Sequence, residues 1–346
     1  MKNTKGFLYN LATGKKQGGV YTLTKFFLFL LSLVYAAAVK IIIFFSRLSA
    51  VRLECRVVSI GNITLGGTGK TSLVEYVARR LKGEGRQVAI LSRGYKSGDE
   101  PFMLQQKLKD TAVIVGADRI RGARQAIKDY AADTVILDDG FQQWRLRKDL
   151  EIVTIDAVNP FGNRHLLPRG ILREPLSGLK RADIFVLTKT NLSRGSDELK
   201  RFLNRINPRA LICESIHRPA GFYDFNNPDE LLNTDSLKGE SVTLFCGIAD
   251  PASFEKLIEN LDIKAALCFR FPDHYNYSEE EFKRIAEESK RRNINILVTT
   301  EKDAARFCPQ GIPCNLQRIL VLRIELVIKG NDKERFDNRL LTLQPL

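Results

Sequence analysis

From residue 55 onward, short runs of β-branched and aliphatic residues alternate with longer amphipathic stretches. Short apolar runs bounded by turn residues predict buried strands, and an apolar period of 3.6 residues predicts helices. The strands are predicted at 56–60, 87–92, 134–137, 151–155, 184–187, 241–246 and 294–299. The helices are predicted at 71–82, 119–130, 253–260 and 278–291. Strands separated by helices form parallel β-α-β units, so the pattern predicts an α/β, doubly wound, mostly parallel sheet with ligands beyond its carboxyl edge.

The chain is long enough for two domains. Its 346 residues, at roughly 150 residues per domain, allow each domain its own core. We expect an N-terminal segment at 1–50, a nucleotide-binding domain at 51–180 and a second, smaller α/β lobe at 181–346 that completes the site. A hydrophobic share of 44% and a charged share of 27% exclude a disordered or fibrous chain.

Residues 26–45 form an apolar run, FFLFLLSLVYAAAVKIIIFF, interrupted only by Lys40. A helical period places the more polar positions on one narrow stripe, formed by Thr22, Lys25, Ser32, Ala36, Lys40 and Arg47. A cleaved signal peptide is disfavoured, because the run continues past the small residues 36–38. A core helix and a spanning helix with a snorkelling Lys40 stay as alternatives. The basic stripe favours a helix in the membrane interface, where its cations meet anionic headgroups.

The predicted strand 56–60 leads into GNITLGGTGKTS, residues 61–72. The ending GGTGKT is typical of a phosphate loop, in which backbone N–H groups and a helix N-terminus surround phosphate oxygens. Lys70 would reach the β- and γ-phosphates, and the Thr71 hydroxyl would bind Mg²⁺. Thr64 stands where the motif usually has its first glycine, but the strand–loop–helix context supports the motif. The expected nucleotide-binding residues are Thr64, Leu65, Gly66, Gly67, Thr68, Gly69, Lys70, Thr71 and Ser72.

A pair of acids follows the predicted strand 134–137. Asp138 and Asp139 precede Gly-Phe-Gln, and an acid at the end of a hydrophobic strand is the magnesium-supporting half of a phosphate-loop NTPase. An isolated Asp-Asp-Gly is more often a turn, but its place downstream of a phosphate loop favours the magnesium role. The sequence contains no Asn-Lys-x-Asp guanine reader, so ATP is the expected nucleotide.

Transfer of a phosphoryl group to a hydroxyl also needs a base near the acceptor. His274 lies in a loop-like segment, FPDHYNY, where a polar side chain faces either a ligand or solvent. Asp99 precedes Glu100 and Pro101 after a Gly-containing turn, and these residues alone favour a plain helix start. The residues by themselves therefore leave the base open.

The charge balance predicts an anionic partner without naming it. The 54 Lys and Arg residues exceed the 40 Asp and Glu residues, which gives a formal charge of +14. Nucleic acid, anionic lipid and phosphorylated substrates would all be attracted to such a protein, although no aromatic–basic RNA module is present. The six cysteines include no Cys-x-x-Cys pair, which favours reduced thiols over a zinc site or disulfides.

Taken together, the motifs resemble the tetraacyldisaccharide 4′-kinase family, the membrane-associated lipid A kinases. The resemblance extends from about Arg47 to Arg306 through GNITLGGTGKTS, LSRGY, GDEP, ILDDGFQ, NPFGN, LLPRG, LREP, RADIFVLTK, GIADP, FPDH and TTEKDA. The chain departs from the family at Gln143, where His is common, and at Arg164-His165, where Gly-Arg is common.

The resemblance implies a reaction and its participants. ATP with Mg²⁺ would phosphorylate the 4′-hydroxyl of tetraacyldisaccharide 1-phosphate, which gives lipid IVA in the biosynthesis of lipid A, the anchor of lipopolysaccharide. Asp99 would be the general base, oriented by His274, and Lys70 would stabilise the transferred group. The implied metal-binding residues are Thr71, Asp138, Asp139 and Glu174, while Arg119 and Arg173 would contact phosphate. Because Asp99 and His274 are far apart in the sequence, we expect them to lie on different lobes.

The resemblance also implies where the protein works. We expect a monomer on the cytoplasmic face of the bacterial inner membrane, bound through its N-terminal helix, with a lipid substrate and no nucleic-acid partner. Two rival hypotheses remain from the residues alone. A membrane-bound ATPase switch would share the loop, the acids and the helix, and a nucleic-acid-dependent NTPase would explain the charge, but neither explains the later motifs.

Overall fold

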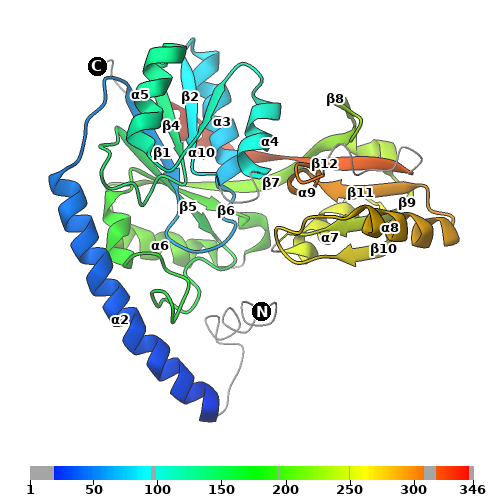
Figure 1. Ribbon diagram of the computed structural model, residues 1–346, viewed down its shortest axis with the longest axis horizontal. Helices are drawn as coiled ribbons and strands as arrows, with labels where there is room; N and C mark the ends of the chain where they lie inside the picture. Colours follow the sequence, from blue (N-terminus) through cyan, green and yellow to red (C-terminus); the bar gives the residue numbers. More distant parts are fainter. Residues whose placement is uncertain (1–18, 95–98, 194, 249, 308–316, 343–346) are drawn as a thin grey trace. The chain divides into compact units, whose positions relative to one another are not determined.

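The computed structural model describes residues 19–94, 99–193, 195–248, 250–307 and 317–342 (Figure 1). These residues form two compact units. The first unit comprises the described parts of Met1–Arg93, Asp110–Ile216 and Ile328–Leu346, and the second those of Gly94–Lys109 and His217–Val327. The chain passes between the units after Arg93, after Lys109, and within two strands, β7 (Leu211–Asp224) and β12 (Arg318–Ile328).

A parallel sheet forms the centre of the first unit. Its strand order is β7-β6-β5-β1-β4-β2-β3, and every neighbouring pair is parallel. The bounds are β1 (Arg56–Gly61), β2 (Val88–Ser92), β3 (Ala112–Val115), β4 (Thr134–Asp138), β5 (Leu150–Asp156) and β6 (Ile184–Thr188). Ile60 pairs with Asp138 and Gly61 with Val153, so β1, β4 and β5 end near the same edge. The predicted doubly wound α/β class is confirmed.

Helices pack on this sheet and bury its apolar strands. α3 (Lys70–Gly83) packs on β1, β2 and β4, and α5 (Arg119–Tyr130) packs on β2, β3 and β4. The remaining helical elements are α6 (Ser196–Ile206), α10 (Gly330–Leu341) and the 3-10 turns η1 (Leu176–Arg181) and η2 (Thr190–Leu192). The Tyr76 hydroxyl donates to Asp337 Oδ1 at 2.9 Å, which fastens α10 to α3.

Helix α2 (Gly19–Leu48) is long enough and apolar enough to cross a membrane over Thr22–Leu48. Most of its large apolar side chains are exposed, namely Leu23, Phe26, Phe27, Phe29, Leu30, Leu31, Leu33, Val34, Ile41, Ile42, Phe44, Phe45 and Leu48. Ser32 and Val39, by contrast, are only 4% and 5% exposed, and Ala36 is half-buried. The expected headgroup-facing stripe is therefore corrected in part: around Ser32 and Ala36 it faces the first unit. An apolar outer surface of this extent indicates membrane association.

The second unit contains a smaller parallel sheet in the order β10-β9-β11-β12. Its elements are β8 (Asn227–Leu232), β9 (Ser241–Cys246), β10 (Lys264–Arg270), β11 (Ile296–Thr300), α4 (Asp99–Lys107), α7 (Pro251–Glu259), α8 (Glu279–Arg291), α9 (Glu301–Ala304) and η3 (Thr234–Leu237). Two ion pairs hold α4 against α9: Lys107 meets Glu301 at 2.8 Å, and Lys302 meets Glu100 at 3.2 Å.

The two units do not follow the boundaries expected from the sequence. Residue 181 was expected to start the second lobe, but β6 pairs with β5, with Ile184 opposite Ile152, inside the first unit. The short α4 segment belongs to the second unit although it interrupts the first in sequence. Two of the six cysteines, Cys308 and Cys314, lie outside the described residues.

Candidate active site

The phosphate loop connects β1 to α3 as the sequence predicts. β1 ends at Gly61 and α3 begins at Lys70, so Lys70 and Thr71 form the first turn of the helix. Gly69 precedes the helix with φ 79°, a left-handed conformation that glycine adopts without strain. Leu65, Gly66 and Gly67 are exposed, which leaves the tip of the loop open to a ligand.

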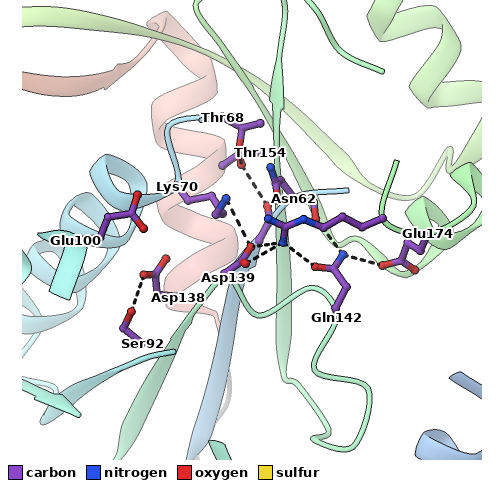
Figure 2. Close-up of polar contacts among 12 residues, drawn as sticks. Asn62, Thr68, Lys70, Ser92, Glu100, Asp138, Asp139, Gln142, Thr154 and Glu174 are labelled. Carbon is purple, nitrogen blue, oxygen red and sulfur yellow. Dashed lines mark hydrogen bonds and ion pairs between the residues drawn. The ribbon is translucent and has the colours of Figure 1, made fainter. Parts of the chain in front are cut away.

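Threonines of the sheet form hydrogen bonds with the phosphate loop, and Figure 2 shows the bond between Thr68 and Thr154. The buried Thr68 hydroxyl shares a 2.7 Å hydrogen bond with the Thr154 hydroxyl of β5. Thr154 also donates to the Gly61 carbonyl at 3.2 Å, and the Thr188 hydroxyl of β6 donates to the Thr68 carbonyl at 3.1 Å. Neither Thr154 nor Thr188 was predicted from the sequence to support the phosphate loop. Their signal is a buried threonine within or at the end of a mostly apolar strand.

Asp138 ends β4 and is 3% exposed. The Ser92 hydroxyl of β2 donates to its Oδ2 atom at 3.1 Å, and an Arg119 guanidinium nitrogen donates to its backbone carbonyl at 3.2 Å. Arg119 is 3% exposed and also donates to the Gly116 carbonyl. The structure therefore places Arg119 behind the acid pair, where it fastens the backbone, and its expected contact with a ligand phosphate has no support in this geometry.

Asp139 lies in contact with two cations of the first unit. The Lys70 ammonium is 3.5 Å from its Oδ1 atom, and Arg173 Nη1 donates to both carboxylate oxygens at 2.8 and 2.9 Å. Burial raises the pKa of this carboxyl, but Lys70 and Arg173 outweigh burial and hold the pKa below its usual range. Figure 2 shows the Lys70 ammonium directed toward Asp139. The phosphate loop and the acid pair predicted from the sequence are thus adjacent.

Glu174 has a different environment from the one expected of a metal ligand. It is fully buried, it forms a 2.9 Å ion pair with Arg181, and it accepts a 3.0 Å hydrogen bond from Gln142 Nε2. Gln142 Oε1 in turn accepts from Arg173 Nη1 at 3.2 Å. Within the part of the chain that the structure describes, no three acidic, His or Cys side chains gather to hold a metal. Arg181 neutralises the charge of Glu174, and Glu174 supports Gln142; its expected role as a metal ligand stays a prediction.

The ion pairs of Asp139 predict an acid-dependent loss of stability. A carboxyl whose pKa is lowered on folding stabilises the protein above its unfolded pKa, about 4, and this contribution is lost as the pH falls through the folded value. The Asp139→Asn variant keeps the size of the side chain and tolerates the φ of 56° at this position. Urea denaturation should show the wild type more stable than the variant at about pH 6, with a smaller difference at about pH 3. A difference independent of pH would contradict this expectation.

The second unit holds His274 by a network around Asp303. The His274 amide donates to the Gly247 carbonyl at 3.1 Å, and Arg306 Nη2 lies 3.3 Å from His274 Nδ1. Asp303 is fully buried and accepts hydrogen bonds from Gly247 N and the Tyr277 hydroxyl, both at 2.9 Å. Burial raises the pKa of Asp303 against the opposing effect of these donors. These contacts hold His274 in place, although its side chain is exposed.

Asp99 begins α4, but its side chain lies outside the described residues. The helix itself is held against α9, which carries Asp303. Asp99 and His274 consequently belong to the same unit. The expectation that they lie on different lobes is wrong, because α4 packs with the second unit although it interrupts the first unit in sequence.

Asp303→Asn is expected to destabilise the fold by about 1–3 kcal/mol, the usual cost of leaving a buried hydrogen-bonding group unsatisfied. Both carboxylate oxygens of Asp303 accept hydrogen bonds, Oδ2 from the Thr300 hydroxyl at 2.6 Å, whereas an amide offers a single acceptor oxygen. Chemical denaturation gives the free energy of unfolding. Asp229→Ala, which removes one partner of an exposed ion pair with Lys109, is the control and should change it by less than about 1 kcal/mol.

A phosphate loop that opens a helix after a parallel strand, with two acids at the end of the neighbouring strand, defines a phosphate-loop nucleotide-binding protein of the α/β class. A family model described as tetraacyldisaccharide-1-P 4′-kinase matches residues 24–97 and 96–344. The chain belongs to this family. It is accordingly an enzyme of the 4′-kinase type in lipid A biosynthesis.

Individual relatives agree with this assignment. The chain is 34% identical to the tetraacyldisaccharide 4′-kinase of Halothermothrix orenii, over 95% of this chain and 96% of that protein. It is 38% identical to the protein of the same name from Elusimicrobium minutum, over 82% and 80% of the two chains. A crystal structure of the "apo" form of LpxK from Aquifex aeolicus in complex with ATP has a TM-score of 0.68 and 27% identity, and covers 90% of this chain and 97% of that one.

Proposed function

We propose that this protein transfers the γ-phosphoryl group of ATP to the 4′-hydroxyl of tetraacyldisaccharide 1-phosphate, which yields lipid IVA. The observation that carries the proposal is the family match over nearly the whole chain. ATP as the donor is supported by the related Aquifex aeolicus structure, which is described as a complex with ATP. An adjacent phosphate loop and acid pair suit phosphoryl transfer, which depends on positioning and on charge stabilisation.

The phosphate loop supplies the donor side of the proposed reaction. Backbone N–H groups of residues 66–69 and the N-terminus of α3 would surround the phosphates, whereas the Leu65 amide already donates to the Ile171 carbonyl. Lys70 would leave Asp139 for the γ-phosphoryl oxygens, and Arg173, which also contacts Asp139, would add a second positive charge nearby. The first turn of α3 would extend the contacts through Ser72.

Mg²⁺ fits the oxygen donors at this edge of the sheet. The Thr71 hydroxyl and the carboxylates of Asp138 and Asp139 are hard oxygen ligands, the type that Mg²⁺ prefers. These three residues would hold the ion directly or through water. When bound, Mg²⁺ would neutralise charge on the phosphate oxygens.

The acceptor side of the proposed reaction needs a base. Asp99 would remove the proton from the 4′-hydroxyl, and His274 would orient Asp99, as the family pattern implies. The support for His274 comes from its surroundings: Arg306 and the Gly247 carbonyl hold its ring and backbone in place. A histidine held in this way would keep Asp99 directed at the hydroxyl, so that little orientational entropy would be lost on binding.

The membrane would deliver the acceptor. The substrate carries four acyl chains and a phosphate, so it resides in an anionic leaflet, and the apolar surface of α2 gives the enzyme access to the same leaflet. The formal charge of +14 would add electrostatic attraction. Because ATP is a cytoplasmic nucleotide, we place the protein on the cytoplasmic face of the bacterial inner membrane.

The test is transfer of label from γ-labelled ATP in detergent micelles with two acceptors. One acceptor is tetraacyldisaccharide 1-phosphate and the other is the same lipid with its 4′-hydroxyl replaced by hydrogen. The proposal expects labelled bisphosphorylated lipid from the first acceptor alone. Label released as inorganic phosphate, with no labelled lipid from folded protein, would instead support an ATPase switch.

A further inference from the structure

The segment of residues 163–173 runs directly beside the phosphate loop. The Leu65 amide donates to the Ile171 carbonyl at 2.8 Å, and the Arg173 amide donates to the Ile63 carbonyl at 2.8 Å. Between these bonds Thr64 and Leu172 form an antiparallel bridge. The beginning of the phosphate loop is thus paired, residue by residue, with the end of the 163–173 segment.

The same segment contacts helix α2. The Tyr35 hydroxyl donates to the Arg173 carbonyl at 2.8 Å, and the rings of Phe29 and His165 meet edge to face with centroids 5.9 Å apart. Tyr35 is half-buried, and burial raises the pKa of its phenol, so the hydroxyl keeps the proton that it donates. Tyr35 lies between Ser32 and Val39 on the side of α2 that faces the first unit.

Arg173 therefore binds three elements with three different groups. Its amide donates to the Ile63 carbonyl in the phosphate loop, its carbonyl accepts from Tyr35 of α2, and its guanidinium donates to Asp139 after β4. We propose that Tyr35 is a positioning residue, whose hydroxyl fixes the Arg173 backbone and so ties the membrane-associating helix to the Asp139 side of the phosphate site.

The physical reason for this positioning role is that the position of a guanidinium group depends on how firmly the backbone that carries it is held. Arg173 is the last residue of the paired segment. Its amide donates to Ile63 of the phosphate loop, but its carbonyl accepts from Tyr35 instead of from the loop. Loss of the Tyr35 hydroxyl would free this carbonyl while the ring still fills its place, so α2 would stay packed and the orientation of Arg173 would loosen. Small errors in the position of a charge that stabilises a transition state reduce kcat more than they reduce substrate binding.

Tyr35→Phe in the full-length enzyme tests this proposal. We expect kcat for lipid phosphorylation to fall about three- to tenfold, as for one hydrogen bond, with the KM for ATP changed less than about twofold. Ser32→Ala is the matched control, because it also removes a hydroxyl from the buried side of α2, but one that donates only to Phe29 within the helix. Unchanged kcat in Tyr35→Phe, or an equal loss in Ser32→Ala, would overturn the proposal.

A double-mutant cycle separates positioning from simple stabilisation. In an Arg173→Lys background, the Tyr35→Phe change should reduce kcat less than about twofold further, because the group that it positions has already been altered. A full, additive loss would show that Tyr35 acts by another route and would contradict the proposal.

The kinetic readout rests on the proposed kinase function, so a second readout is independent of it. Amide hydrogen exchange of Arg173 and Leu65 should become about three- to tenfold faster in Tyr35→Phe, while exchange in α5 stays as in the wild type. If the wild type made no phosphorylated lipid but this change in exchange occurred, the proposed function would fail and the coupling would stand. Unchanged exchange at both amides would contradict the coupling itself.

Discussion

Replacing Lys70 by methionine is expected to lower kcat for lipid phosphorylation about a thousandfold. Lys70 begins α3 with its ammonium 3.5 Å from Asp139, at the end of the phosphate loop. Removal of a single neutral hydrogen-bond donor to a developing negative charge costs about 10²–10³ in kcat, and Lys70 carries a full charge in addition. Methionine keeps the length and much of the apolar volume of lysine, so the loop should still fold. Single-turnover rates with γ-labelled ATP measure the effect.

The control for Lys70→Met lies on the same helix. Lys82 is near the other end of α3 and its ammonium donates to the Asp110 carbonyl at 2.7 Å, away from the acid pair. Lys82→Met removes the same charge and should leave kcat within about twofold of the wild type, as expected of a surface substitution outside the site. A loss in Lys70→Met no larger than in Lys82→Met would show that Lys70 does not stabilise the transferred group.

The parallel sheet was predictable because its signal is local. Strands such as β1 and β4 are buried along their whole length, so each appears in the sequence as a short, mostly apolar run. The glycines before Lys70 and the acids at the end of β4 are also local signals, since parallel strands bring their carboxyl ends to one edge. Sequence alone therefore placed the loop beside Asp138 and Asp139 correctly.

What the sequence did not reveal depends on partners distant along the chain. The family resemblance implied a metal-binding role for Glu174, but nothing in the sequence predicted that Arg181 and Gln142 would neutralise and hold it. Arg119 similarly turned out to serve the backbone of Asp138. The sequence shows the charge of a residue and hence the kinds of group that it can bind. The fold determines which of these groups lies next to it.

The unit boundaries were missed for a related reason. Helix α4 follows β2 directly in sequence, so it was assigned to the first domain, but its ion pairs join it to α9 of the second unit. The pattern of one short helix contains no information on which sheet it will cover. This difference matters for the mechanism, because it places Asp99 and His274 in one unit.

Asp99→Ala is expected to lower kcat for lipid phosphorylation by about 10²–10⁴, the usual contribution of a general base. Asp99 begins α4, and the ion pairs of Glu100 and Lys107 with α9 fix the helix from which it extends. Because the 4′-hydroxyl would lose its base while ATP would keep all its contacts, the KM for ATP should change little. The acid limb of the kcat profile against pH should disappear in the variant, since a base must be deprotonated to act.

The adjacent acid supplies the control for Asp99→Ala. Glu100→Ala removes a carboxylate one residue along the same helix, together with the 3.2 Å ion pair to Lys302, a partly exposed pair worth about 1 kcal/mol or less. Its kcat should stay within about threefold of the wild type, and the acid limb should persist. If Glu100→Ala lost activity as Asp99→Ala does, the common cause would be the placement of α4 and not the base. If Asp99→Ala retained its rate and its acid limb, the kinase would stand and its base would have to be a different residue.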